Sequence, residues 1–293
     1  MPLVTRRQKL KQAVGGALLS MVGRRRMWRL GRALYRVARH DVDNDPSRNG
    51  ERWLQATVLD LFRDEPRVVV FDVGANVGGW TRMLLDQVPA ARAHALDVYA
   101  FEPVRSTMET FHQRLGGHPL LTRVHPVPAA LSDSDGTVEM YEVEPNGTTN
   151  SLHPDPFRPT RRVAIETQTA DTFCARDGIA KVHLLKVDAE GHDCSVLRGA
   201  TLLFAQERVM VAQFEYNHRW IYARHYLKDV FDFAAGLPYA VGKLTAGGVE
   251  VYDGWHFEME RFFEANYVLI HRDLLARIPA VRGTYTMDDN TYA

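Results

Sequence analysis

Short apolar runs alternate with amphipathic stretches through most of this chain. Mostly apolar runs at residues 68–73, 182–187 and 209–214 predict buried parallel strands. Helical periodicity follows two of these runs, at residues 78–87 and 194–204. Because strands and helices alternate, the sequence predicts an α/β fold with a parallel sheet and crossover helices.

The same pattern predicts the remaining elements. Further strands are expected at 98–101, 124–127, 137–143, 163–168 and 266–270, and a hairpin at 239–252. Further helices are expected at 53–62, 104–115, 170–176 and 219–235. Residues 144–162 contain four prolines and no periodicity, which predicts a long loop of the kind that often carries function. The last ten residues are expected to fray.

One main domain is expected from 293 residues, of which 45% are hydrophobic. The polar stretch at residues 41–50 breaks the pattern before the first predicted helix of that domain. We therefore divide the chain into a basic amphipathic N-terminal arm over residues 1–45, a main domain over 46–275 and a C-terminal tail over 276–293.

Charge is distributed unevenly, although the formal net charge is zero. Residues 1–40 contain eleven Lys and Arg and no Asp or Glu, which leaves 25 basic against 36 acidic residues in the rest of the chain. Residues 24–39 place Met27, Leu30, Leu34 and Val37 at helical spacing among arginines. We expect this stripe to pack against the domain or a second subunit, as in a homo-oligomer. Peripheral contact with a membrane is the second interpretation, and nucleic-acid binding, which the acidic body disfavours, is the third.

Two cysteines, Cys174 and Cys194, provide no disulfide framework and no C-x-x-C pair for zinc, which favours a reducing compartment. The apolar segment at residues 13–23 is too short to span a bilayer. It continues into three arginines without a small-residue cleavage site, so secretion is not expected. The sequence therefore predicts a cytoplasmic protein, with the inner face of the membrane as a further location.

A glycine-containing turn, DVGANVGG, follows the first predicted strand. Gly74 and Gly78 allow the backbone to approach a ligand, and Glu102, at the end of the next strand, can accept both hydroxyls of a ribose. Asn76 stands where a dinucleotide fingerprint requires its second glycine, which disfavours a nicotinamide-dependent dehydrogenase. Asp72 would repel a phosphate and can accept a hydrogen bond from an ammonium group.

These features favour a ligand that has adenosine and an ammonium group but no phosphate, such as S-adenosylmethionine. The alternative is an ordinary strand-turn-helix with no ligand. The loop by itself does not decide between them.

Acidic residues and a histidine gather after the run at 182–187. Asp188, Glu190, His192 and Asp193 follow that strand, and Glu215 ends the next one. Since these strand ends meet at one edge of the sheet, the side chains can provide a base. Asp188, Glu190 and Glu215 can alternatively hold a hard divalent cation such as Mg²⁺. In a purely structural interpretation, Asp193 or His192 caps the following helix and Glu190 forms an ion pair.

Five segments in this order resemble the FkbM family of S-adenosylmethionine-dependent methyltransferases: VFDVGANVGGWT, YAFEP, AALSDSDG, NGTTNSL and LLKVDAEGHDCSVLRGA. The resemblance covers about half of the chain, over residues 68–215. It implies a class I methyltransferase fold, which is Rossmann-like, with helices on both faces of a seven-stranded, mostly parallel sheet whose last strand is antiparallel. It also implies O-methylation of hydroxyls on sugars, glycolipids or polyketide-type products.

The resemblance also implies roles for individual residues. The loop around the methionine part would be formed by Asp72, Gly74, Asn76 and Gly78. Glu102 would bind the ribose, Ser132 and Asp133 would lie beside the adenine, and Asp188 and Glu190 would face the substrate.

For the chemistry we expect Asp188 as orienting carboxylate or base, His192 as the second candidate base, and Glu215 in support. Asn150, Ser151 and His153 can bind hydroxyls of a small-molecule or glycan acceptor, or the prolines around them only route the chain. The rival functions are methylation of a carboxylate or a nucleic acid, and a non-catalytic binding module with the same fold.

Overall fold

The computed structural model describes residues 6–41, 45–143, 150–286 and 290–292. It divides into two compact units, Met1–Val42 and Asp43–Ala293, the second of which we call the body. The first unit contains α1 (Arg6–Val22) and α2 (Arg24–Ala38). Among the helices of the described residues, none is both long and apolar enough to cross a bilayer.

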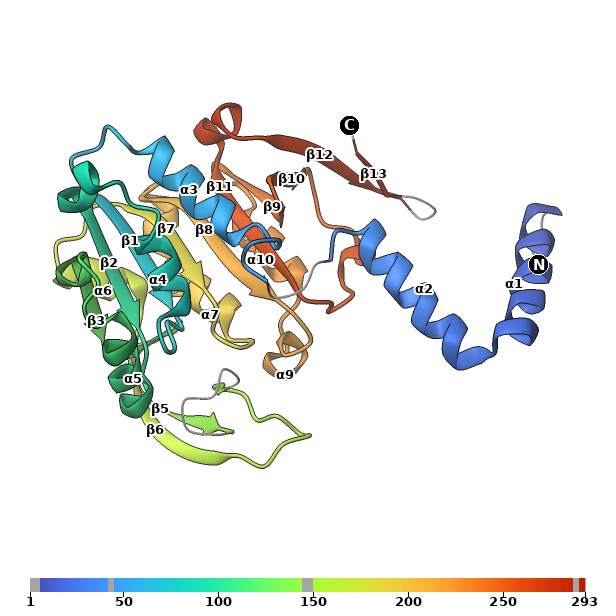
Figure 1. Ribbon diagram of the computed structural model, residues 1–293, viewed down its shortest axis with the longest axis horizontal. Coiled ribbons are helices and arrows are strands. Elements are labelled where there is room, and N and C mark those ends of the chain that lie inside the picture. Colours follow the sequence, from blue (N-terminus) through green and yellow to red (C-terminus); the bar gives the residue numbers. More distant parts are fainter. Residues whose placement is uncertain (1–5, 42–44, 144–149, 287–289, 293) are drawn as a thin grey trace. The chain divides into compact units, whose positions relative to one another are not determined.

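A large mixed sheet forms the centre of the body (Figure 1). Over the described residues its strand order is β13-β12-β10-β9-β11-β8-β7-β1-β2-β3. The strands are β1 (Val68–Val73), β2 (Leu96–Phe101), β3 (Val124–Val127), β7 (Val182–Val187), β8 (Val209–Tyr216), β9 (Tyr239–Thr245), β10 (Gly248–Tyr252), β11 (Ala265–His271), β12 (Ala280–Tyr285) and β13 (Asn290–Tyr292). The run from β3 to β8 is parallel, and β11 is antiparallel to both of its neighbours, β8 and β9.

This arrangement confirms the predicted α/β class and the mostly parallel sheet, in which β11 is the one reversed strand among the seven from β3 to β9. The sheet is wider than the seven strands expected, because β10, β12 and β13 extend it beyond β9 in the described part of the chain.

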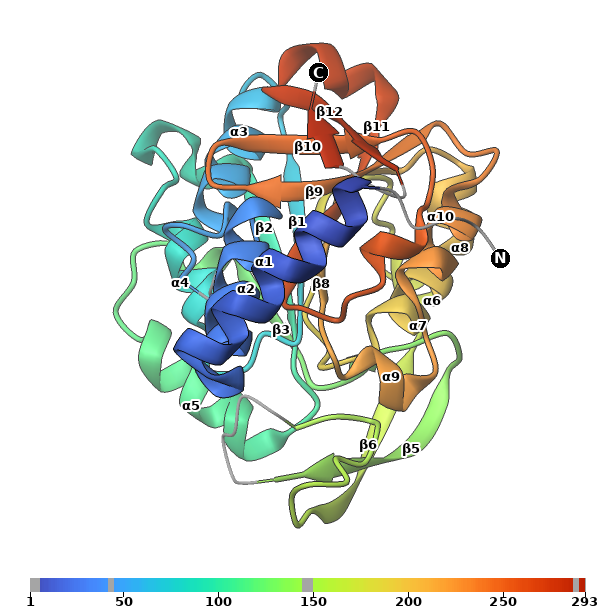
Figure 2. The same ribbon diagram turned by 90° about the vertical axis from the view of Figure 1, so that its right-hand side faces the viewer.

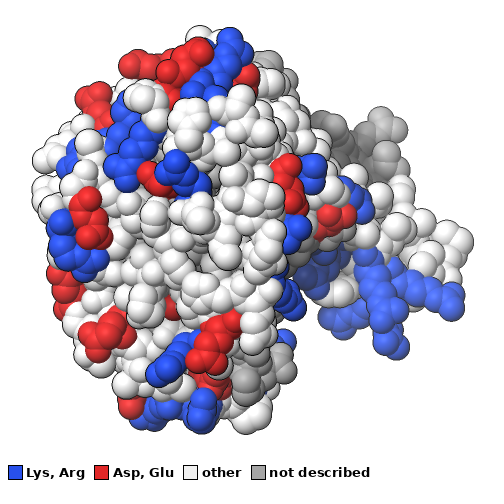
Figure 3. Space-filling view, turned by 60° about the vertical axis from the view of Figure 1, so that its left-hand side comes forward, with Lys and Arg blue, Asp and Glu red and all other residues white. Residues whose placement is uncertain are grey.

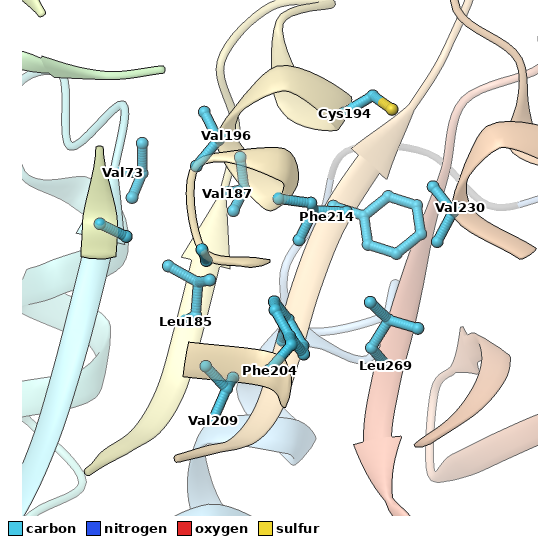
Figure 4. Close-up of a cluster of buried hydrophobic side chains, with 14 of the residues drawn as sticks. Val73, Leu185, Val187, Cys194, Val196, Phe204, Val209, Phe214, Val230 and Leu269 are labelled. Carbon is cyan, nitrogen blue, oxygen red and sulfur yellow. The ribbon is translucent and has the colours of Figure 1, made fainter. Parts of the chain in front are cut away.

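Helices cover both faces of the sheet. One face carries α3 (Glu51–Leu61), α4 (Gly79–Leu85) and α5 (Arg105–Leu115). The other carries α6 (Ala170–Arg176), α7 (Asp193–Arg198), α8 (Thr201–Ala205), α9 (Trp220–Ala223) and α10 (Leu227–Ala234). Since successive strand residues point to opposite faces, Val70 packs in the first cluster and Phe71 in the second. Figure 4 shows part of the second cluster, where Phe204 and Val230 meet the β-strand residues Leu185 and Phe214.

Two predicted helices are each divided in two, which corrects the continuous helices expected at 194–204 and 219–235. The first is interrupted at Gly199, where an added Cβ would lie 1.9 Å from the carbonyl oxygen of Ser132. The second is interrupted at Arg224, which has a left-handed φ of 57°. Close backbone contact and local handedness therefore override the helical pattern at these points.

The expected fraying of the C-terminus is wrong for residues 284–285 and 290–292. Within the expected tail, β12 pairs in parallel with β10, and β13 pairs with β12. Most residues of β12 are exposed, so no alternation of apolar and polar residues marks this strand in the sequence. Backbone pairing with β10 therefore orders β12, although most of its side chains are exposed.

A second sheet of the described body has the order β4-β6-β5, with β4 (Ala130–Leu131), β5 (Gly136–Glu142) and β6 (Arg161–Gln168). Figure 2 shows β5 and β6 projecting beyond one end of the main sheet. Residues 144–149 of the expected long loop lie outside the described residues. The next part of that loop is tied to β5, because Ser151 forms an antiparallel bridge with Tyr141.

Candidate functional site

A cavity of about 560 Å³ opens at the carboxyl ends of the central parallel strands. Its wall includes Gly74 after β1, Glu102 after β2, Asp188 after β7 and Glu215 near the end of β8. This is the edge at which open α/β sheets bind ligands. The structure therefore brings both sequence clusters, the glycine turn and the acidic segment, to a single cavity.

Two glycines of the turn, Gly74 and Gly78, allow it to pack closely against neighbouring segments of the body. Gly74 has a φ of +72°, and an added Cβ would lie 2.0 Å from the carbonyl oxygen of Asp188. At Gly78, which has a φ of +83° and does not line the cavity, a Cβ would lie 2.4 Å from a side-chain carbon of Leu115. Gly79 is different, because it lines the cavity and its Cβ position is in open space. The room for a ligand is thus at Gly79 rather than at Gly78.

Glu102 connects the first two strand ends. Its side chain accepts the backbone N–H of Asn76 at 3.1 Å on Oε2 and that of Val104 at 2.9 Å on Oε1. The residue is 7% exposed, and this burial raises the pKa of Glu102 to about 7. Each carboxylate oxygen keeps a further lone pair, so the group can still accept hydroxyls from a ligand in the cavity.

Asp72 lies beneath the turn and does not line the cavity. It is fully buried, accepts the hydroxyl of Thr81 at 2.5 Å, and has its Oδ1 3.1 Å from Nζ of Lys186. Burial alone would lower the pKa of Lys186, but Asp72 and Asp188 raise it above its usual range. In this structure Asp72 neutralises a buried lysine, and its expected contact with an ammonium group would require a change of partner.

Three carboxylates predicted for chemistry line the cavity together: Asp188, Glu190 and Glu215. Glu190 has a left-handed φ of 52° and pairs with Arg219. Burial and the charge of Asp188 raise the pKa values of Glu190 and Glu215 well above the usual range. No three His, Cys, Asp or Glu side chains of the described residues are grouped so that they could hold a metal ion. Among the described residues, the carboxylates of the cavity are thus close enough to shift one another's pKa values but are not grouped as a set of metal ligands.

His192 lines the cavity and is linked to two other elements. Its Nε2 lies 2.9 Å from Oγ of Ser132, and its Nδ1 lies 3.2 Å from Nε2 of His153. Burial lowers the pKa of His192 to about 4, so its ring is neutral near pH 7. Asp193 is fully buried and accepts the backbone N–H groups of Ala189 and Gly191, so it stabilises the turn.

Of the remaining predicted residues, some line the cavity and others do not. The buried Ser132 and the exposed Asp133 do not line the cavity, whereas the preceding Ala130 and Leu131 do. Asn150 and Ser151 are on the wall, where Ser151 donates its hydroxyl to the backbone carbonyl of Glu190 at 2.7 Å. His153 does not line the cavity, but its ring contacts His192 and its backbone N–H donates to Oγ of Ser151 at 3.1 Å.

Several lining residues were not predicted from the sequence: Asn49, Glu51, Trp80, Lys186, Asn217, Arg219, Glu264 and Asn266. Lys186 gave the clearest signal, as a charged residue inside the apolar run 182–187. Glu51 gave no such signal in the sequence. Its side chain accepts a hydrogen bond from Gln213 at 2.7 Å, and Gln213 is 162 residues away in the chain.

Curated proteins similar to this chain include two methyltransferases. The hexuronic acid methyltransferase AglP of Haloferax volcanii is 29% identical over 133 residues, which cover 45% of this chain and 50% of that protein. Methyltransferase 1 of Beauveria bassiana is 25% identical over 155 residues, which cover 47% of this chain and 59% of that protein. The chain thus spans about half the length of the curated relatives it matches.

Solved structures and a family model give further similarities. The crystal structure of methyltransferase FkbM from Methylobacillus flagellatus has a TM-score of 0.43 at 17% identity, covering 73% of this chain and 47% of that one. A putative O-methyltransferase from Klebsiella pneumoniae has a TM-score of 0.41 at 10% identity, and the match covers 74% of this chain and 79% of that one. The model of the methyltransferase FkbM domain matches residues 72–242, more than half of the sequence. This chain therefore belongs to the FkbM methyltransferase domain family.

Proposed function

We propose that this protein is an S-adenosylmethionine-dependent O-methyltransferase whose acceptor is a hydroxyl of a sugar or a similar polyol. The observation that carries the proposal is the position of Glu102. Its two oxygens are held by backbone N–H groups of the β1 turn and of the segment after β2, and it shares one cavity with Asp188. Family membership and the name of the Haloferax relative, which acts on a hexuronic acid, support the same class of reaction.

The residues present fit this cofactor. The volume of about 560 Å³ lies within the range of about 300–1,000 Å³ typical of small-molecule sites. Glu102 offers acceptors for the ribose hydroxyls, Gly79 leaves open space beside the turn, and Phe101 and Leu131 offer apolar surface for a base. When bound, S-adenosylmethionine supplies a methyl group activated by its sulfonium.

The task of the protein is then to orient the acceptor hydroxyl and remove its proton. Alignment of the reacting atoms can contribute about 7–11 kcal/mol, and a positioned base about 10²–10⁴-fold. We assign the removal of the hydroxyl proton to Asp188, whose side chain lines the cavity and is 40% exposed. His192 is the weaker candidate, since both of its ring nitrogens have partners and its pKa is about 4. Glu215 accepts a hydrogen bond from the side-chain amide of Asn217 on Oε2 at 2.9 Å, and we assign it a supporting role in orienting the acceptor hydroxyl.

The charge of the wall narrows the class of acceptor. Six carboxylates of the described residues line the cavity, against one lysine and one arginine: Glu51, Glu102, Asp188, Glu190, Glu215 and Glu264, with Lys186 and Arg219. Carboxyl and amide oxygens accept hydrogen bonds from hydroxyls and ammonium groups. A phosphate or carboxylate would need a cation, and the lysine and arginine of the wall are already paired with acidic side chains of the protein. We therefore favour an uncharged or amine-bearing polyol over a free hexuronic acid or a nucleic acid. Figure 3 shows acidic and basic side chains interspersed over one face of the body, with no continuous basic surface on it.

The proposal is tested in two steps with the full chain. S-adenosylhomocysteine should raise the unfolding temperature, whereas NAD should not. Labelled S-adenosylmethionine is then incubated with neutral sugars, amino sugars, hexuronic acids, glycolipids, natural-product aglycones and RNA. Label in neutral or amino sugars supports the proposal. Label only in RNA or in free carboxylates would overturn the assignment of the acceptor. If S-adenosylhomocysteine does not bind, the proposal of an S-adenosylmethionine-dependent enzyme is overturned.

A further inference from the structure

Helix α2 separates apolar and basic side chains along its length. Arg25, Arg29, Arg32 and Arg36 recur at helical spacing and form one stripe. A second stripe, which we call the apolar stripe, is formed by Met27, Leu30, Leu34 and Val37. Residues at i, i+3, i+7 and i+10 fall on one side of a helix, so the two stripes occupy different sides.

The apolar stripe is largely exposed. Leu30, Leu34 and Val37 are 57%, 61% and 75% exposed, and no residue of α2 is buried. A contiguous row of exposed aliphatic side chains is unusual on a soluble protein and marks a surface that binds something apolar. The stripe therefore predicts an apolar ligand or partner.

The charge of the segment limits what that partner can be. Residues 1–40 contain eleven Lys and Arg and no Asp or Glu. A nucleic acid would neutralise the arginines but leave the apolar stripe in water. The same segment of a second copy would cover the stripe but would bring together two segments that each carry eleven basic and no acidic residues.

An anionic bilayer offers suitable partners to both the apolar and the basic side chains of the helix. Acyl chains can cover the apolar stripe, while phosphate and other anionic groups pair with the arginines. Trp28 and Tyr35 lie close to arginine side chains, with Arg32 5.3 Å from the Trp28 ring and Arg39 5.5 Å from the Tyr35 ring. Trp and Tyr prefer the depth of the lipid headgroups, where an apolar ring meets a polar layer.

We propose that α2 is an interfacial membrane helix, which lies in the plane of an anionic lipid surface and inserts its apolar stripe. This inference does not depend on the proposed methyl transfer. It assigns peripheral binding only, since none of the described helices is suited to span a bilayer.

The test is co-sedimentation of the full chain with vesicles of phosphatidylcholine, alone or mixed 3:1 with phosphatidylglycerol. We expect binding to the mixed vesicles at 0.1 M salt, and at least tenfold weaker binding to neutral vesicles or at 0.5 M salt. The triple variant Leu30→Gln, Leu34→Gln, Val37→Gln should bind mixed vesicles at least tenfold more weakly. Its matched control, Leu202→Gln with Ile221→Gln, changes residues of the body that are 59% and 50% exposed and should bind normally.

A second pair of variants separates charge from insertion. Arg25→Gln, Arg29→Gln, Arg32→Gln should abolish the preference for anionic lipid. The control, Arg63→Gln, Arg105→Gln, Arg162→Gln, removes three arginines of the body whose side chains are 65%, 94% and 66% exposed, and should retain the preference. Unchanged thermal unfolding of the body confirms that each variant is folded.

Two outcomes would overturn the proposal. One is full vesicle binding by the apolar triple variant, which would make the contact purely electrostatic. The other is absence of vesicle binding by the unaltered chain, whether it then binds duplex DNA or self-associates through α2.

Discussion

The ammonium of Lys186 lies 3.1 Å from Oδ1 of Asp72 and 3.5 Å from Oδ2 of Asp188, so one cation serves a buried carboxylate and a cavity carboxylate. Breaking a buried pair by removing one partner typically costs about 3–5 kcal/mol. We expect Lys186→Met to lower the free energy of unfolding by about that amount, measured by urea unfolding at pH 7. Asp72→Asn combined with Lys186→Met should recover most of the loss. A double variant as unstable as Lys186→Met would show that the lysine acts through other contacts.

Gly74 and Gly79 lie in the same turn but should respond differently to alanine. Gly74→Ala places a Cβ against the carbonyl oxygen of Asp188 at a left-handed φ, so we expect a loss of more than about 2 kcal/mol in unfolding free energy. Gly79→Ala meets open space at the start of α4, so stability should be unchanged or higher by up to about 1 kcal/mol. Its affinity for S-adenosylhomocysteine should fall, as measured by calorimetry. Equal stability of the two variants would show that the close approach of Gly74 to Asp188 does not constrain the turn.

His192 should make stability depend on pH. Burial lowers its folded-state pKa from 6.5 to about 4, so the unfolded chain binds a proton more readily between these values. Its contribution to the free energy of unfolding is complete above pH 6.5 and decreases toward pH 4, by about 2 kcal/mol at pH 5. Urea unfolding at pH 7 and pH 5 should show a smaller pH-dependent loss for His192→Gln than for the unaltered chain. Identical losses in both proteins would exclude this role.

Glu102 should couple cofactor binding to proton release. Its pKa is raised to about 7, and hydroxyl donors from a ribose favour its ionised form. Affinity for S-adenosylhomocysteine should therefore rise from pH 6 to pH 8, with protons released on binding, as detected by calorimetry in two buffers of different ionisation enthalpy. Glu102→Gln should bind at least about tenfold more weakly and lose the pH dependence. The control Glu109→Gln changes an exposed acid of α5 and should do neither.

Asp188 should affect turnover rather than cofactor binding. With an acceptor found in the labelling panel, Asp188→Asn should reduce the rate of methyl transfer by about 10²–10⁴-fold, as expected for loss of a positioned base. Affinity for S-adenosylhomocysteine should change little. Asp232→Asn, at an exposed acid of α10, is the matched control. Undiminished methyl transfer by Asp188→Asn would remove this residue from the mechanism.

The sequence predicted best the elements whose own side chains determine them. The bounds of β1 and β7 were predicted correctly because both are mostly apolar runs buried on both faces. The two divided helices and β12 were not predicted, since a backbone contact at Gly199, a left-handed residue at Arg224 and pairing of an exposed strand leave no periodic signal.

The candidate site was predictable where strand ends carry polar residues, as at Glu102, Asp188 and Glu215. Partners supplied from distant segments were not, such as Glu51 from the start of α3 and Arg219 from the turn before α9. The sequence also did not show that Asp72 forms an ion pair with Lys186. That contact depends on the register of the parallel strands β1 and β7, which places the two residues side by side.

The parallel pairing of β12 with β10 has a consequence for how the chain behaves when it is shortened. Every residue of β10 but one is buried, and β12 occupies the hydrogen-bonding edge of that strand. A chain ending at residue 275 would expose these backbone groups next to an apolar surface, and such an edge templates strand addition from another molecule. The C-terminal strands therefore protect the body from aggregation, and a truncated protein should precipitate at concentrations that the intact chain tolerates.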